Sequence, residues 1–124
     1  HETALFLYDL TDRDPLQYSV TVKAGYNAKN IKDSGVKVYS IKKDLYDLGL
    51  ITAKTPFNRL VKTYDMERTI CDIIRSRSQM DIEILTDALK RYTKRKDKNL
   101  PQLMRYADKF RITTVLRKYL EVLL

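Results

Sequence analysis

Apolar residues recur with helical spacing in the second half of the chain, beginning directly after Asp65. Met66, Ile70, Ile73 and Ile74 lie four, three and one positions apart, so we expect them to share one face of a helix. Asp65 precedes this run, and its carboxylate can accept a hydrogen bond from the first turn, which predicts the N-terminal cap. We expect the other faces of this helix to carry Glu67, Arg68, Asp72 and Arg75.

Three more helices are predicted after this one. The first begins after Asp81, the second has Asn99 as its cap and Pro101 in its first turn, and the third begins at Thr113. The last two each have one apolar face. These faces consist of Leu103, Met104, Ala107 and Phe110, and of Val115, Leu116, Tyr119, Leu120 and Leu123.

The first half of the chain has the spacing of strands, after one short helix that the apolar residues of positions 1–10 predict. Apolar and polar residues alternate at positions 18–23, as in a half-buried strand. Positions 36–41 are rich in β-branched and aromatic residues, which favours a second strand. Two strands are therefore predicted before position 42.

A short helix and a β-hairpin are predicted next. Positions 43–48 contain two leucines three apart and are followed by a glycine, which predicts a short helix that ends at that glycine. The extended stretches 51–55 and 60–64 flank a four-residue connection that contains Pro56 and Asn58, residues that favour a turn. This pattern completes the predicted strands.

The order of these elements, strands first and helices afterwards, predicts an α+β fold and not a doubly wound sheet. We expect a small mixed sheet with a β-hairpin in the first half, packed against a C-terminal set of about four helices. The chain has 124 residues, three glycines, three prolines and no internal repeat. A single domain over residues 1–124 is therefore expected.

The charge balance favours a polyanion or an acidic surface as the partner. The chain has 24 basic and 16 acidic residues and a formal net charge of +8. Six of the nine residues from 90 to 98 are basic. On a helical projection five of them fall within an arc of roughly 140°. We name these five the basic cluster and predict that they bind nucleic acid: Lys90, Arg91, Lys94, Arg95 and Lys98.

The alternative is that the basic cluster is the solvated end of a helix, where cations also suit the negative end of the helix dipole. The opposite face of the same projection is apolar and predicts the side that packs on the core. This face consists of Leu85, Ala88, Leu89 and Tyr92.

Cys71 is the sole cysteine, and its apolar neighbours predict a buried thiol in a reducing compartment, which places the protein in the cytoplasm. No uncharged apolar run approaches the roughly 18 to 20 residues of a membrane span, and no leader is visible. We expect a monomer that does not contact a membrane. Because the chain opens at His1 without an initiator methionine, we expect it to be a fragment.

The sequence offers few parts for catalysis, and we expect neither an enzyme nor a bound cofactor or metal. One cysteine and one histidine cannot build a zinc site or a Cys–His pair of the usual kind, and three isolated glycines form no phosphate-binding loop. The charged residues after Asp65 favour a structural role. Arg68 and Asp72 lie four apart and can pair on one helix face, while Asp65 and Glu67 suit the positive helix N-terminus.

A metal-dependent nuclease of restriction-endonuclease type is the alternative in the class of enzymes. Such enzymes present a carboxylate two residues before a lysine on a hairpin. Thr52 stands in that place before Lys54, and a hydroxyl holds a divalent cation less strongly than a carboxylate does. A plain structural scaffold is the third possibility.

Two stretches of the chain resemble the AbiEi family, the antitoxin and autorepressor half of AbiE abortive-infection systems. They are HETAL at positions 1–5 and YDMERTICDIIR at positions 64–75, and the similarity extends to ALKRY at 88–92 and to positions 116–124. The resemblance marks four positions of this chain, which we name the signature residues. These are Glu67, Arg68, Thr69 and Asp72.

The resemblance implies an antitoxin and transcriptional autoregulator. In such a protein a winged helix-turn-helix domain binds operator DNA, and a C-terminal domain carries the antitoxin activity. This chain is similar to the C-terminal domain and lacks the winged-helix region, so we do not expect it to bind a specific sequence alone. The implied partner is a nucleotidyltransferase-like toxin of a type IV system, in which antagonism does not require a stable complex. The basic cluster would assist operator binding.

Overall fold

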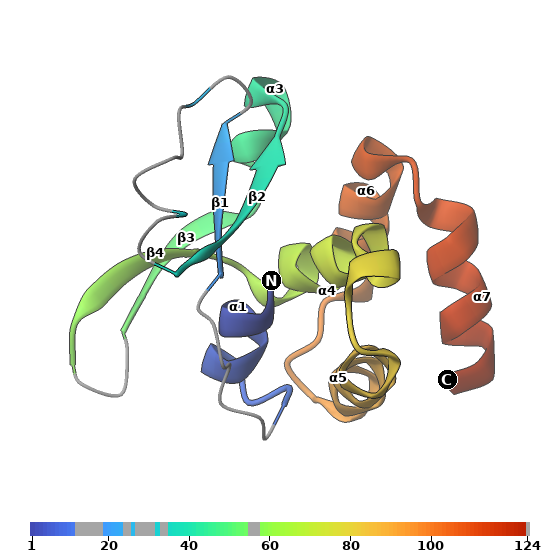
Figure 1. Cartoon of the computed structure of the whole chain (residues 1–124). Coiled ribbons are helices and arrows are strands. Elements are labelled where there is room, and N and C mark those ends of the chain that lie inside the picture. The colour runs from blue at the N-terminus through green and yellow to red at the C-terminus, as the bar shows by residue number, and fades with distance from the viewer. Residues whose placement is uncertain (12–18, 24–25, 27–31, 33–34, 55–57, 124) are drawn as a thin grey trace.

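The computed structural model describes residues 1–11, 19–23, 26, 32, 35–54 and 58–123. Its strands lie on one side of the molecule, and the helix α4 (Met66–Arg75) lies between them and the later helices (Figure 1). The predicted α+β class is confirmed, as is the order of strands before the main helices. Position 18 and positions 55–57, which belong to the predicted first strand and hairpin, lie outside the described residues.

All four helices predicted for the second half are present. The side chains of Asp65 and Asn99 each accept a hydrogen bond from a backbone N–H of the first helical turn, which confirms both as N-caps. Asp81, after which a helix was predicted to begin, caps α5 in the same way. The described helices are α1 (Glu2–Leu7), α3 (Lys43–Tyr46), α4, the 3₁₀ turn η1 (Arg77–Gln79), α5 (Ile82–Lys94), α6 (Leu100–Phe110) and α7 (Thr113–Leu123).

The strands form two separate two-stranded sheets, not the single mixed sheet that the sequence predicts. β1 (Ser19–Lys23) runs parallel to β2 (Lys37–Ile41) over five residue pairs. β3 (Leu50–Lys54) and β4 (Leu60–Tyr64) form the predicted antiparallel hairpin. The difference has a physical reason: alternation of apolar residues identifies a strand but does not say which edge it pairs with.

Helix α4 is the centre of the core. It contacts α1, α5, α6 and α7, and every residue from Met66 to Ile74 is buried. The prediction that its apolar stripe is buried is therefore confirmed. The sequence did not predict that Glu67, Arg68 and Asp72 are buried as well, a result of the packing of α1, α5, α6 and α7 against α4.

Cys71 is a buried free thiol, as the sequence predicts, and its Sγ atom lies 3.9 Å from the carbonyl oxygen of Leu103. Burial, followed by the negative charge of Asp72, raises the pKa of this thiol to about 12. Among the helices of the described residues, none has the length and apolar character needed to cross a membrane.

Candidate functional site

The four signature residues lie on the buried helix α4, and Arg68 connects this helix to several other parts of the chain. Its side chain is 0% exposed. Nε donates to Oδ1 of Asp72 at 3.0 Å, which confirms the predicted pair one helical turn apart. Nη1 donates to the carbonyl oxygens of Leu45 at 2.8 Å and Leu48 at 2.7 Å. The planar guanidinium has donors in several directions, so one side chain joins α4 to α3 and the segment after it.

Two aromatic rings complete the environment of Arg68. Its guanidinium carbon lies 3.9 Å from the centre of the Tyr64 ring and 4.6 Å from that of Phe110. A cation at such distances is attracted by the electron density of the ring faces. The Nη2 atom of Arg68 has no hydrogen-bond acceptor among the described residues. The rings therefore supply part of the stabilisation that a buried guanidinium needs.

Gly49 lies beside the Arg68 side chain and has no Cβ atom that would collide with it. Its φ angle is +76°, and a Cβ atom at this position would lie 2.7 Å from Cβ of Arg68 and 3.1 Å from Oδ1 of Asp65. The carbonyl oxygen of Gly49 also accepts a hydrogen bond from the backbone N–H of Asp65 at 2.7 Å. Both the backbone angle and the close approach therefore favour glycine here.

Glu67 joins three helical segments through one carboxylate oxygen. Its Oε2 accepts a hydrogen bond from the hydroxyl of Tyr92 in α5 at 2.8 Å and from the backbone N–H of Asn99, before α6, at 3.2 Å. Burial raises the pKa of Tyr92, and the hydrogen bond to Glu67 raises it further. Glu67 therefore holds α5 and the start of α6 against α4.

Asp65 and Thr69 satisfy the first turn of α4. Oδ1 of Asp65 accepts from the backbone N–H of Arg68, and its Oδ2 accepts from the hydroxyl of Tyr106 in α6 at 2.6 Å. Thr69 Oγ1 donates to the carbonyl oxygen of Asp65 at 2.8 Å. Burial and the Asp65 carboxylate raise the pKa of Tyr106 to about 12. These bonds hold the helix start and α6 together.

Asp72 connects α4 to His1. Its Oδ1 also accepts from Nη1 of Arg75 at 3.0 Å, and its Oδ2 lies 4.0 Å from Nδ1 of His1. The His1 ring stacks on Tyr39 of β2 with 3.6 Å between ring centres and an angle of 4° between the rings. Its Nε2 lies 2.9 Å from Oγ of Ser76. Asp72 is thus the acceptor for two arginines from its own helix and lies beside an imidazole.

Sequence reasoning did not find the aromatic and imidazole partners of these carboxylates. The interactions of Tyr92, Tyr106 and His1 are made across 25, 41 and 71 positions of sequence, respectively, so spacing along one helix does not reveal them. One signal was present: Tyr92 lies on a face that is otherwise apolar, and a buried tyrosine hydroxyl usually has a hydrogen-bond partner. Most of the tyrosines that the structure describes are buried or half-buried.

The basic cluster is not one helix face, as the projection suggests, because α5 ends at Lys94. Arg95 has extended backbone angles, φ −74° and ψ 140°. Lys98 lies beyond the helix and its Nζ donates to the carbonyl oxygen of Arg95 at 3.0 Å. The opposite, apolar face of α5 is confirmed as core. The predicted geometry of the basic cluster was therefore wrong, and its binding of nucleic acid stays a prediction.

Two arginines of the basic cluster bind within the chain. Arg91 Nε pairs with Asp87 at 3.1 Å. Arg95 Nη1 donates to the carbonyl oxygen of Tyr8 at 2.7 Å, and its other nitrogens pair with Asp97. This pairing raises the pKa of Arg95 and lowers that of Asp97. Arg95 therefore ties the end of α5 to α1.

The exposed cations of this region are its lysines. Lys90 and Lys94 are exposed on α5, and Lys96 is exposed just after it. Among the described residues, none of these three ammonium groups has a hydrogen bond or an ion pair. They are consequently available to a polyanion.

Thr52 and Lys54, the positions of the nuclease alternative, are both exposed on β3 of the hairpin. Within the described part of the chain, no group of three or more His, Cys, Asp or Glu residues is arranged to hold a metal ion. The described residues therefore give the nuclease alternative no added support.

Comparison with protein-family models and with curated proteins found no match to this chain. What the chain does must therefore be inferred from its own residues and their geometry.

Proposed function

We propose that this chain is a regulatory binding domain of the AbiEi antitoxin type, which acts in the bacterial cytoplasm without catalysis. In this proposal it counteracts a nucleotidyltransferase-like toxin and strengthens the binding of operator DNA through exposed lysines. The observation that carries the proposal is that two groups of polar residues differ in burial and in what they bind. The signature residues are buried and bind other parts of the same chain, whereas lysines at the end of α5 are exposed.

Buried, mutually bonded polar groups specify one arrangement of α4 against its neighbours. A carboxylate that already accepts hydrogen bonds from Tyr92 and Asn99, as Glu67 does, contributes to folding with no reaction required. In this proposal, positions 64–75 resemble antitoxins because their buried residues hold the domain together, and not because they contact a partner. The surface would carry the recognition, with Lys90, Lys94 and Lys96 as its cations.

Rescue of bacterial growth tests the antitoxin activity. We expect the chain, co-expressed with its cognate toxin, to restore growth, because the proposed activity resides in this domain. Arg68→Leu leaves buried acceptors unpaired, so it should lose rescue together with soluble protein. Lys43→Glu, a change at an exposed position, should rescue like the parent chain. Absence of rescue, with soluble protein verified by immunoblot, would contradict the proposal.

Salt-dependent DNA binding tests the role of the exposed lysines. We expect the double variant Lys90→Glu/Lys94→Glu to bind a random-sequence duplex more weakly. The slope of log affinity against log salt should become shallower by roughly 0.9 for each phosphate that the variant no longer neutralises. The control Lys42→Glu/Lys43→Glu makes the same change in net charge at exposed positions before and in α3.

An equal change of slope in both double variants would mean that only net charge matters. An unchanged slope in Lys90→Glu/Lys94→Glu would mean that these lysines do not bind DNA.

A further inference from the structure

The apolar residues of helix α7 form two adjacent stripes, of which the first is buried in the core and the second only partly so, with Val115 and Tyr119 packed against the core at one side. Leu116 and Leu120 are buried against the other helices. Val115, Tyr119 and Val122 follow one another at four and three positions, so they form a second stripe along α7. This second stripe is half-buried at its first two residues, and Val122 is 83% exposed.

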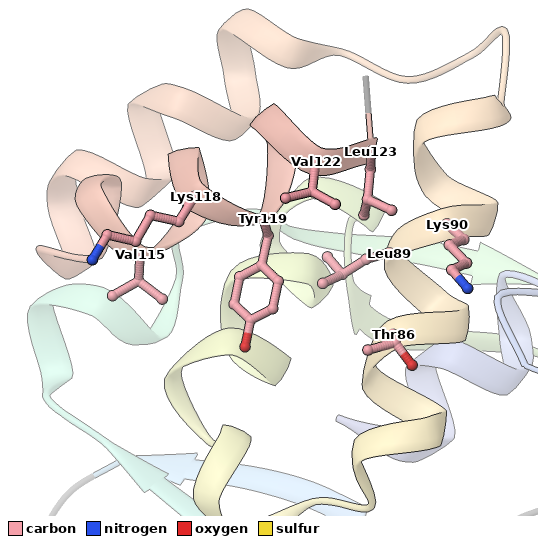
Figure 2. A pocket seen from close by; sticks show the side chains of 8 residues that line it. All are labelled: Thr86, Leu89, Lys90, Val115, Lys118, Tyr119, Val122 and Leu123. Atoms are coloured by element: carbon pink, nitrogen blue, oxygen red, sulfur yellow. The ribbon is translucent and has the colours of Figure 1, made fainter.

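The second stripe of α7 faces α5 across a cavity of about 670 Å³, which we name the α5–α7 groove. Figure 2 shows Val115, Tyr119, Val122 and Leu123 of α7 on one side and Leu89 of α5 on the other. Five apolar or aromatic side chains thus line a concave surface between two helices. Grooves of this kind accept the apolar face of a third helix.

The charged side chains among the described lining residues of the α5–α7 groove are both cationic. Among the described residues that line it, the charged ones are Lys90 and Lys118, and both lysines are exposed. Their side chains lie on opposite sides of the view in Figure 2. The groove is therefore apolar along its floor and cationic at its edges.

We propose that the α5–α7 groove binds an amphipathic helix of a partner protein, one whose apolar stripe is flanked by acidic residues. The apolar stripe would cover Val115, Tyr119 and Val122, and the flanking carboxylates would approach Lys90 and Lys118. A second copy of this chain fits less well, because each copy has a net charge of +8. The inference goes beyond the proposed function and does not depend on antitoxin activity.

A designed peptide tests the proposal directly. The probe is a capped peptide of about 18 residues, five helical turns, with leucines three and four apart and glutamates beside them. The matched probe has the same composition in scrambled order, so that the apolar stripe is lost and the charge is kept. We expect the first peptide to bind at least tenfold more tightly than the scrambled one, measured by fluorescence anisotropy with the whole chain.

Variants of exposed residues locate the binding without disturbing the core. Val122→Asp should weaken binding of the designed peptide about tenfold or more, since it places a carboxylate in the apolar stripe. The control Ile82→Asp makes the same change at another exposed apolar residue, 60% exposed, outside the groove. Lys90→Gln/Lys118→Gln should weaken binding more than Lys96→Gln/Lys109→Gln, an equal change of charge elsewhere on the surface.

Equal binding of both peptides, or equal effects of Val122→Asp and Ile82→Asp, would overturn the proposal. A dimer in light scattering that Val122→Asp dissociates would also overturn it, because the occupant would then be a second copy. Growth rescue tests the antitoxin proposal separately, whether or not the designed peptide binds. Lys94→Glu, which changes no groove residue, separates DNA binding from peptide binding.

Discussion

Arg68 is stabilised in the core by several hydrogen bonds and by two nearby aromatic rings. A buried charge is strongly destabilising unless its partners are in place. Here the partners are one carboxylate, two backbone carbonyls and two aromatic rings. The arrangement also depends on glycine at position 49, because a Cβ atom there would lie too close to Arg68. A substitution of Gly49 therefore tests it.

Gly49→Ala should destabilise the protein more than Gly35→Ala does. Both glycines have positive φ angles, +76° and +87°, so each alanine incurs a backbone penalty of roughly 1 kcal/mol. Only the Cβ atom at position 49 meets a neighbour, at 2.7 Å from Arg68, whereas the one at position 35 has no described atom within 4 Å. The additional cost at position 49 is expected to be about 1–3 kcal/mol.

Urea denaturation measures both glycine variants under the same conditions. Equal midpoints for Gly49→Ala and Gly35→Ala would show that Arg68 moves aside without loss, contrary to the tight approach described for Gly49.

At the scale of elements, the end of α5 is held by the carbonyl oxygen of Tyr8, the residue that follows α1, as well as by its own neighbours Asp97 and Lys98. Arg95 leaves the helix and donates to the carbonyl oxygen of Tyr8 at 2.7 Å. Arg95→Ala should remove this bond at a cost of roughly 1 kcal/mol. It should also raise the hydrogen exchange of the amides of α1. Asp97→Asn keeps the bond to Tyr8 and removes the exposed partner of Arg95, so exchange in α1 should stay unchanged. Equal hydrogen exchange of the α1 amides in Arg95→Ala and Asp97→Asn would show that the bond from Arg95 to Tyr8 does not stabilise α1.

Much of the element order could be predicted from local patterns. The caps Asp65 and Asn99, and the helix start after Asp81, were found because the beginning of a helix depends on a few neighbouring residues. The end of α5 was missed because the residues from Lys94 to Lys98 include neither glycine nor proline, and the acceptor to which the Arg95 side chain donates there, the carbonyl oxygen of Tyr8, is distant in sequence. Sheet partners were missed because pairing joins distant segments.

The candidate site was predicted only where its contacts lie within one helix. The pair of Arg68 and Asp72 lies within one helix, and helical spacing alone identified it. The hydroxyl partners of Glu67 and Asp65 come from α5 and α6. Burial of all four signature residues follows from the elements packed around α4, a property of the assembled fold and not of the helix.

At the scale of the whole molecule, tyrosines link the two halves of the chain to each other. The Tyr8 hydroxyl donates to the carbonyl oxygen of Tyr64 at 2.6 Å, and the Tyr64 hydroxyl donates to that of Tyr46 at 2.7 Å. Burial raises the pKa of Tyr8 and of Tyr64 to about 12, from an ordinary value near 10. The native protein therefore retains these protons at pH values where the unfolded chain releases them.

Stability should consequently fall in alkaline solution. Raised pKa values in the folded state contribute stability that is complete below about pH 10 and is lost as the pH rises towards 12. We expect the urea midpoint to fall over this range, with release of tyrosine protons following unfolding in absorbance. Tyr64→Phe should show a smaller fall than the parent chain. A fall of the same size in both would assign the effect to other groups.

Arg68 binds the backbone of residues 45 and 48, not their side chains. A carbonyl oxygen is present whatever amino acid is encoded, so this interaction tolerates any substitution that preserves the local chain path. Homologous chains can consequently diverge in composition around α3 while keeping the arginine. The glycine at 49 and the arginine at 68 are therefore expected to persist as a linked pair in such chains, whatever amino acids stand at 45 and 48.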